Sequence, residues 1–172
     1  NSEFPTEMRR HDPAVTVVDI MVSQRHSGGW SGGHSSLANG SFPSASVMQN
    51  FNTMELYMHH GCSEHRDRYQ KSDGTYGGCH EWDYSQYMQI CDEAGNSSSC
   101  STEFGYWITT YGREGRWLTD ISPRLFELVE GGDRMFRYRG ANGGWLNVSV
   151  YLSNWDDDGL RPTSGELDFS GG

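Results

Sequence analysis

The segment from Asn154 to Gly159 carries oxygen-bearing side chains at alternate positions, a spacing that could hold a hard cation. Asn154, Asp156 and Asp158 lie two residues apart, and Gly159 follows them. Oxygen ligands at this spacing can converge on one Ca²⁺ ion while the glycine allows a sharp turn. The twelfth position of such a loop should be a glutamate, but it is Gly165 here, and a glutamate comes one residue late. The pattern therefore favours a solvated acidic turn with no cofactor required, and a calcium site is the alternative.

Histidines gather in the middle of the chain, and imidazoles are common ligands of transition metals. His59 and His60 are adjacent, and further histidines and acidic residues follow at His65, His80, Glu64 and Asp67. If the two adjacent histidines lie on a strand, their side chains face opposite ways and cannot readily bind one ion. The spacing favours solvated loop histidines over a metal site.

Four cysteines divide the centre of the chain, at Cys62, Cys79, Cys91 and Cys100. None has a Cys-x-x-Cys spacing, which argues against a zinc knuckle or a redox pair. Four cysteines allow three pairings. Polar loops separate Cys62 from Cys79 and Cys91 from Cys100, so we predict sequential pairing. A disulfide from Cys62 to Cys91 or Cys100 is the alternative.

Three Asn-x-Ser sequons accompany the cysteines, at Asn39, Asn96 and Asn147. Disulfides form in oxidising compartments, and N-glycans are added to surface loops of secreted proteins. The sequence therefore predicts a secreted or cell-surface protein that carries glycans on these asparagines.

The charge balance excludes one class of partner. The 172 residues include 13 Lys and Arg against 23 Asp and Glu, which gives a net charge of −10. A nucleic-acid-binding protein would need a basic footprint, so we expect no nucleic acid partner.

No apolar run approaches the roughly 18 residues of a membrane-spanning helix, so we expect no membrane insertion. Aromatic residues make up 13% of the chain, which favours a folded core over disorder.

Period-two alternation predicts β-strands along most of the chain. In the first of them, residues 15–23, Val18, Ile20 and Val22 would share one face. Further strands are expected at residues 51–60, 81–91, 104–111, 116–121, 135–139 and 144–154. Residues 24–45 are rich in Gly and Ser and predict a long loop, and Ser122-Pro123 predicts the start of a short helical turn.

Many short strands with almost no helix predict an all-β, two-sheet sandwich. We expect the sandwich to span residues 15–155, stapled by the two disulfides. A polar arm with little structure of its own is expected at residues 1–14. An acidic tail or linker that contains Gly and Ser is expected at residues 156–172.

Four segments combine aromatic with polar residues in a particular order. They are residues 79–83 (CHEWD), 107–112 (WITTYG), 117–122 (WLTDIS) and 144–145 (GW). In this order they resemble the amino-terminal jelly-roll domain of the peptide-N-glycosidase F family, which has Cys-x-x-Trp-Asp, Ile-Thr-Pro-Tyr and Asp-Val-Thr elements. The resemblance covers about residues 51–152 and implies that the sandwich is a jelly roll.

The family consists of secreted amidases that use carboxylates, without a metal, to cleave the bond between a glycan and its asparagine. The resemblance implies that Asp83 matches the principal catalytic aspartate. Amide hydrolysis needs a base to activate water and an acid to assist the leaving amine. The chain departs from the family at Tyr84, where the enzymes have Arg, and at residues 137–140, where they have a glutamate. A second jelly roll, with a further glutamate, would lie beyond Gly172.

Because Asp83 is the one match among three catalytic carboxylates, we predict a non-catalytic structural or adhesive extracellular module. Its expected partners are further copies of itself or neighbouring domains of a longer chain. The arm and the tail could reach edge strands of a neighbour and build an assembly or filament. One alternative is half of an amidase that releases N-glycans. The other is a carbohydrate-binding module with glycans as partners.

Overall fold

The computed structural model describes residues 8–26, 35–79, 83–140 and 144–154. Its strands are β1 (Thr16–His26), β2 (Ser35–Ser44), β3 (Thr53–Cys62), β4 (Tyr69–Gln70), β5 (Tyr76–Gly77), β6 (Ser85–Cys91), β7 (Cys100–Ile108), β8 (Gly115–Asp120), β9 (Gly131–Arg139) and β10 (Gly144–Ser153). Between them lie the short helical elements α2 (Ala45–Met48), η1 (Ser63–His65), η2 (Ser97–Ser99) and η3 (Ser122–Leu128).

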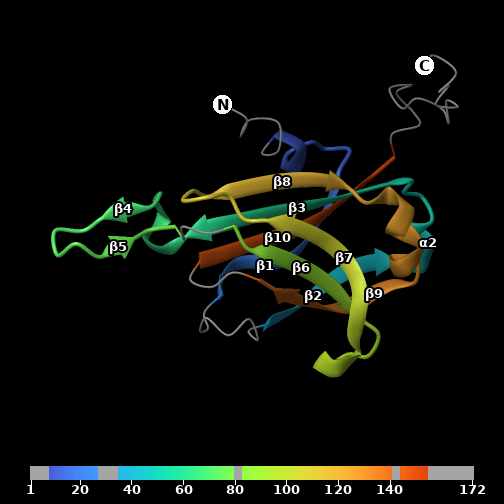
Figure 1. Cartoon of the computed structure of the whole chain (residues 1–172). Coiled ribbons are helices and arrows are strands. Elements are labelled where there is room, and N and C mark those ends of the chain that lie inside the picture. The colour runs from blue at the N-terminus through green and yellow to red at the C-terminus, as the bar shows by residue number, and fades with distance from the viewer. Residues whose placement is uncertain (1–7, 27–34, 80–82, 141–143, 155–172) are drawn as a thin grey trace, which may run out of the picture.

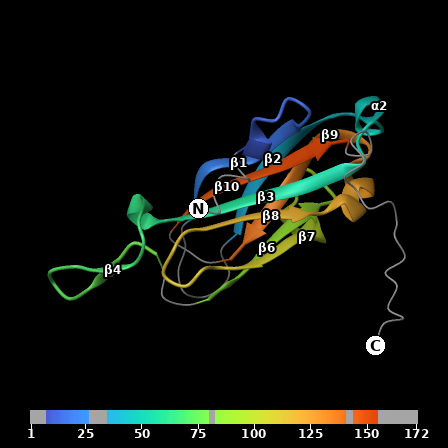
Figure 2. The same cartoon turned by 90° about the horizontal axis from the view of Figure 1, so that it is seen from above.

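Two antiparallel sheets of four strands form the body of the molecule (Figures 1 and 2). Sheet A has the order β1-β10-β3-β8, and sheet B has the order β2-β9-β6-β7. The predicted all-β, two-sheet sandwich is confirmed. Strands β4 and β5 form a separate hairpin that projects from one end of the sandwich (Figure 1).

Side chains that alternate along the central strands fill the space between the sheets. On β3, Met54, Leu56 and Met58 are completely buried, as the alternation predicts. Phe104 and Phe136 face them from sheet B, with ring centroids 5.4 Å apart. Burying a side chain of this size contributes about 1.5–3 kcal/mol relative to leaving it exposed, so the interior of the sandwich provides most of the folding energy.

The first strand departs from simple alternation. Val18 and Ile20 are buried as predicted, but Val22 is 68% exposed. The cause is a bulge, because the pairing of β1 with β10 shifts register between Asp19 and Met21. Met21 therefore enters the core in place of Val22. A bulge inserts one extra residue and so reverses the face of the residues that follow it, here until a second register shift between Met21 and Gln24.

The predicted loop at residues 24–45 is wrong in its second half, because β2 occupies Ser35–Ser44. This strand pairs with β9 along most of its length. Phe42 is buried against Phe136 of β9, with ring centroids 6.0 Å apart. The four serines and the glycine of β2 have little strand propensity of their own, so the ladder with β9 and the burial of Phe42 hold the strand in place.

Several other boundaries differ from those expected. The strand predicted at 81–91 begins at Ser85, and the one predicted at 104–111 begins earlier, at Cys100. The strand predicted at 135–139 begins at Gly131, whose φ of +61° permits the turn after η3. The short helix predicted at Ser122 is confirmed. The Ser122 hydroxyl makes no capping hydrogen bond to this helix and accepts one from the Met54 N–H of β3.

The disulfides join Cys62 to Cys79 and Cys91 to Cys100, the sequential pairing that the spacing favours. The first closes residues 62–79, which include η1 and the β4–β5 hairpin. The second closes the turn between β6 and β7. The two disulfides therefore lie at opposite ends of strand β6.

The described part of the N-terminal arm, residues 8–14, is attached to sheet A by two arginines. Arg9 donates to Glu55 at 2.8 Å, and Arg10 makes a two-pronged ion pair with Asp19. The guanidinium of Arg10 holds the pKa of Asp19 below its ordinary value. These residues are therefore anchored to their own sandwich. The predicted tail at residues 156–172 lies outside the described residues.

Candidate functional site

Several of the segments that connect the strands lie at one end of the sandwich, which we call the loop end. In sheet A, the last residues of β1 and β3 pair with the first residue of β10, Gly144. In sheet B, Ser85 at the start of β6 pairs with Ile108 at the end of β7. The described connecting residues 63–79, 83–84 and 109–114 therefore lie at the same end of the two sheets. Loop ends of this kind often carry binding or catalytic residues on a rigid scaffold.

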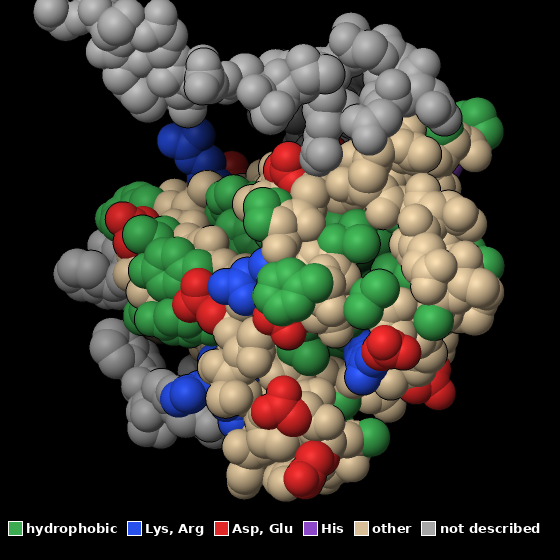
Figure 3. Space-filling model, turned by 90° about the vertical axis from the view of Figure 1, so that its right-hand side faces the viewer, with side chains coloured by type: hydrophobic (Ala, Val, Ile, Leu, Met, Phe, Trp, Pro, Cys, Tyr) green, Lys and Arg blue, Asp and Glu red, His purple; other side chains and the backbone are tan. Residues whose placement is uncertain are grey.

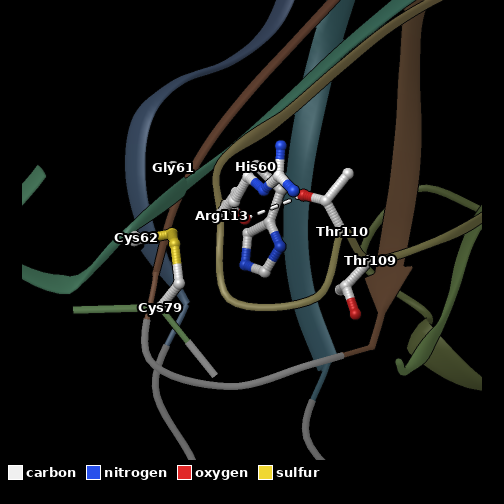
Figure 4. A pocket seen from close by; sticks show the side chains of 7 residues that line it. All are labelled: His60, Gly61, Cys62, Cys79, Thr109, Thr110 and Arg113. Atoms are coloured by element: carbon white, nitrogen blue, oxygen red, sulfur yellow. Dashed lines mark hydrogen bonds between the residues drawn. A yellow bond between two sulfur atoms is a disulfide. The ribbon is translucent and has the colours of Figure 1, made fainter. Parts of the chain in front are cut away.

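A small hollow opens at the loop end. It is lined by His60, Gly61, Cys62, Cys79, Thr109, Thr110 and Arg113. Figure 4 shows the His60 imidazole between the disulfide and Thr109. The Thr110 hydroxyl donates to the Arg113 carbonyl oxygen at 2.8 Å, which closes the turn that forms one wall. The Cys62–Cys79 disulfide forms the opposite wall.

Asp83 is joined to this hollow through the backbone of the next residue. It is exposed and precedes β6 by two residues, in the place where the stapled segment enters its strand. The next residue, Tyr84, donates its N–H to the Thr109 hydroxyl at 2.8 Å and accepts the Thr109 N–H at 2.9 Å. Two hydrogen bonds thus fix the backbone next to Asp83 to a residue of the hollow wall. Strand β6 is flanked by β9 and β7, so Asp83 lies at the end of an interior strand rather than beside a sheet edge.

Among the described residues that line the hollow, Arg113 supplies a positive charge and none supplies a carboxylate. Glu114 is next in sequence, but its carboxylate accepts the Cys62 N–H at 3.1 Å and lies 3.4 Å from His59 Nε2. Partial burial alone would raise the pKa of Glu114. The bonds from Cys62 and His59 outweigh it, so the pKa is lowered. Glu114 is therefore a charged structural partner of β3.

The structure places the two adjacent histidines on opposite faces of β3, as the sequence predicts. His60 faces the buried interior, whereas His59 is half-buried on the outer face of sheet A, as alternation along a strand requires. In the described part of the chain, no three His, Cys, Asp or Glu side chains are arranged to hold a metal ion. Asn154 of the predicted calcium loop is exposed, and Asp156 and Asp158 lie outside the described residues. The calcium site stays a prediction.

The three sequons occupy different environments. Asn39 and Asn96 are exposed, and their glycosylation stays a prediction. Asn147 lies on interior strand β10, where its carbonyl oxygen accepts a β1 backbone N–H at 2.8 Å and its amide lies 3.3 Å from His59 Nδ1. Its sequon partner Ser149 is 2% exposed. In the folded protein the Asn147 amide is therefore engaged, and a glycan there would have to replace these contacts.

Sequence reasoning missed a group of side chains on the outer face of sheet B, which we call the tyrosine strip: Ser85, Tyr87, Tyr106 and Ile108. The two tyrosine rings lie 5.1 Å apart and the Ser85 and Tyr106 hydroxyl oxygens 3.1 Å apart. Asp83, Ser85 and Tyr87 are exposed at alternate positions, so the strip leads toward Asp83. The alternation of exposed residues on β6 could have indicated this surface from the sequence. The pairing of β6 with β7, which brings Tyr106 and Ile108 to it, could not be inferred from that alternation.

Comparison with known proteins identifies the fold by structural similarity, whereas the sequence comparisons assign no family. No family model and no curated protein matches the sequence. A solved structure of recombinant N-glycanase F (PNGase F) matches 82% of this chain with a TM-score of 0.59 and 14% sequence identity. A structure of PNGase F, a glycosylasparaginase from Flavobacterium meningosepticum, matches 81% with a TM-score of 0.57 and 15% identity.

The sandwich therefore has a PNGase F-like jelly-roll fold, as the sequence resemblance implied. This chain spans 42% of the length of each of the two structures. The two disulfides agree with a protein of an oxidising compartment. In the parts of the chain that are described, no helix is long and apolar enough to cross a membrane.

Proposed function

We propose that this chain is one jelly roll of a secreted amidase that acts on the bond between a glycan and its asparagine. The observation that carries the proposal is the position of Asp83 in a PNGase F-like fold. Its carboxylate is exposed at the loop end, and its neighbour Tyr84 is fixed to a wall of the hollow through Thr109. The fold similarity supports this alternative better than the non-catalytic adhesive module that the broken carboxylate set had favoured.

In the proposed reaction, Asp83 accepts a proton from water while the water oxygen bonds to the side-chain carbonyl carbon of the glycosylated asparagine. The carbon–nitrogen bond then breaks, the glycosylamine leaves with a proton, and the asparagine becomes an aspartate. In this proposal the guanidinium of Arg113, a residue that lines the hollow, stabilises the negative charge that develops on the carbonyl oxygen. The Thr110 hydroxyl donates its hydrogen to the Arg113 carbonyl oxygen, and its oxygen can still accept a hydrogen bond from a polar, neutral substrate.

The acid that protonates the leaving amine has no counterpart among the described residues of the hollow. Glu114 is turned toward Cys62 and His59, and the other described acidic residues of this end lie on the segment with the projecting hairpin. In our proposal a further part of a longer protein supplies this acid. The match covers less than half of each solved structure, which supports such an arrangement.

Binding at the loop end can be tested with the chain itself. We expect a peptide that carries N-acetylglucosamine on asparagine to shift the amide resonances of Thr109, Thr110 and Arg113 in an NMR titration. Asp83→Asn should weaken these shifts. Asp92→Asn, an equal change at the opposite disulfide, should leave them unchanged. Shifts confined to other surfaces, or no shifts at millimolar glycopeptide, would contradict the proposal.

The tyrosine strip favours a second candidate function, that of a carbohydrate-binding module. Tyr87 and Tyr106 are 37% and 46% exposed, and their rings and hydroxyl groups can contact both faces and edges of a sugar. In this case Tyr106→Ala abolishes glycan binding while Asp83→Asn has no effect. Phe126→Ser removes an aromatic ring that is 67% exposed at the other end of the sandwich, and it is the control.

A further inference from the structure

An exposed arginine continues the tyrosine strip across the outer face of sheet B. Arg139 of β9 is paired in register with Tyr87 of β6, and Tyr87 is paired with Tyr106 of β7. On the other side of β9, Arg139 is paired with Ser35 of β2. Residues paired in this way share one face of an antiparallel sheet. A guanidinium, two tyrosine rings and a serine hydroxyl therefore form one row across the sheet, near its loop end.

The guanidinium of Arg139 is exposed and forms no ion pair within the described part of the chain. Several other arginines do form ion pairs. Arg10 is bonded to Asp19 on sheet A, and Arg124 lies 3.9 Å from Glu127. Figure 3 views the end of the sandwich that carries α2 and η3, where basic side chains lie beside acidic ones. Arg139 therefore differs from these cations, because its charge and its donors are available to a ligand.

The next row on this face adds a second positive charge. The Arg137 guanidinium donates only to neutral acceptors in the described structure: the Gln89 side-chain oxygen, at 2.9 and 3.1 Å, and two carbonyl oxygens of the turn between β6 and β7. Glu103, the acidic residue of this row, is paired with Gln89 on β7, so strand β6 lies between it and β9. No carboxylate occupies a position paired with Arg137 or Arg139 on β2 or β6. The two arginines therefore make β9 locally positive.

We propose that this row binds glycans that contain a carboxylate-bearing sugar, with the carboxylate on Arg139 and sugar rings on Tyr87 and Tyr106. A guanidinium can donate two parallel hydrogen bonds to a planar carboxylate, and such charge-assisted bonds are strong. The two tyrosine rings lie 5.1 Å apart at an angle of 63°, and they offer apolar surface and hydroxyl groups to a sugar. The three neighbouring strands span about 10 Å, a width across which sugar rings can lie.

Charge and distance indicate which part of a glycan occupies the row. A chain of net charge −10 repels anions over most of its surface, whereas arginines without acidic neighbours attract them. Tyr87 follows Asp83 by four residues, which is at most about 13 Å of extended backbone. The acidic sugar is therefore a distal one, and the sugar on the asparagine lies nearer to Asp83. This inference rests on the proposal that the chain acts on glycans, and it adds which glycans they are.

Titration calorimetry with three matched glycans tests the proposal. They are an N-glycan that ends in sialic acid, its methyl ester, and the same glycan without sialic acid. The ester keeps the shape of the acidic sugar and removes its charge. We expect wild type to bind the acid at least about tenfold more tightly than the ester, the effect of a hydrogen bond between charged groups. Equal affinity for the acid and the ester, or no binding of any of the three, would overturn the proposal.

Two arginine variants test the assignment to this row. Arg139→Gln should abolish the preference for the acid and leave the affinity for the neutral glycan unchanged. Arg25→Gln removes the same charge from an exposed arginine of β1, in the other sheet, and should keep the preference. A preference that persists in Arg139→Gln, or that Arg25→Gln abolishes as well, would overturn the assignment. Glycan release from a denatured glycoprotein reports on the amidase instead. Release without a preference for the acid refutes this inference alone, and a preference without release refutes the amidase alone.

Discussion

Removal of the Cys62–Cys79 disulfide should reduce stability and ligand binding together. Cys62→Ser with Cys79→Ser opens the segment that carries the β4–β5 hairpin and removes one wall of the hollow. Cys91→Ser with Cys100→Ser is the matched control, because it opens a loop at the opposite end of strand β6. Both variants lose one disulfide and keep the other.

The expected loss of stability follows from the lengths of the two loops. The paired cysteines are 17 residues apart in the first disulfide and 9 in the second. In the chain-entropy model these separations correspond to about 3.1 and about 2.6 kcal/mol at 25 °C. The two variants should therefore be destabilised almost equally. Their difference of about 0.5 kcal/mol is too small to explain a large difference in binding.

Urea unfolding followed by tryptophan fluorescence measures the two losses of stability, and the glycopeptide titration measures binding. At a urea concentration where both variants are fully folded, we expect the control to bind as wild type does and the Cys62–Cys79 variant to bind weakly or not at all. Equal binding by the two variants would refute the reasoning that this disulfide shapes the site. A destabilisation several times larger in one variant would refute the loop-length argument.

Three further predictions concern the fold. Arg10→Ala should lower the free energy of unfolding at pH 7 by less than about 1 kcal/mol, because the ion pair is partly exposed. Since the pair lowers the folded-state pKa of Asp19 from 3.8, its contribution is present above that pH and lost as the pH falls through the folded value. In urea unfolding at successively lower pH values below 3.8, the difference between the variant and wild type should shrink, and an unchanged difference would point to packing alone. Gly131→Ala should cost about 3 kcal/mol or more, because φ is +61° and an added Cβ would lie 1.8 Å from a β2 carbonyl oxygen. A melting temperature equal to that of wild type would contradict it. Tyr138→Phe should lower the free energy of unfolding by about 1–3 kcal/mol, because the buried Gln86 carbonyl oxygen loses the Tyr138 hydroxyl that donates to it at 2.7 Å. An unchanged urea midpoint would show that this hydrogen bond adds nothing to stability.

The sheets and both disulfides could be predicted from the sequence because their signals are local. Met54, Leu56 and Met58 alternate with polar residues, and this pattern specifies one buried face. The disulfides follow from two polar loops, each bounded by cysteines. Strand β2 could not be predicted in this way, because its composition is that of a loop. Its two large apolar residues, Leu37 and Phe42, do not make an alternating pattern, and Phe136, the partner of Phe42, lies far away in the sequence.

The bulge in β1 and the details of the site depend on contacts between strands. The sequence places Val22 on the core face, and only the register with β10 shows that Met21 takes that place. Asp83 could be singled out by resemblance to a family. The hydrogen bonds that join Tyr84 to Thr109, by contrast, link two loops that are distant in sequence. The tyrosine strip likewise needs the pairing of β6 with β7.

The most direct measurement of the central proposal is glycan release in water enriched in the heavy isotope of oxygen. The protein is the full reading frame that contains this chain, and the substrate is a denatured glycoprotein. We predict that each asparagine that loses its glycan becomes an aspartate with one heavy oxygen atom, because water supplies the oxygen of the new carbon–oxygen bond. Asp83→Asn should abolish this product, and Asp92→Asn should leave it unchanged. Glycan release that persists in Asp83→Asn, or a wild-type protein that releases no glycan, would contradict the account.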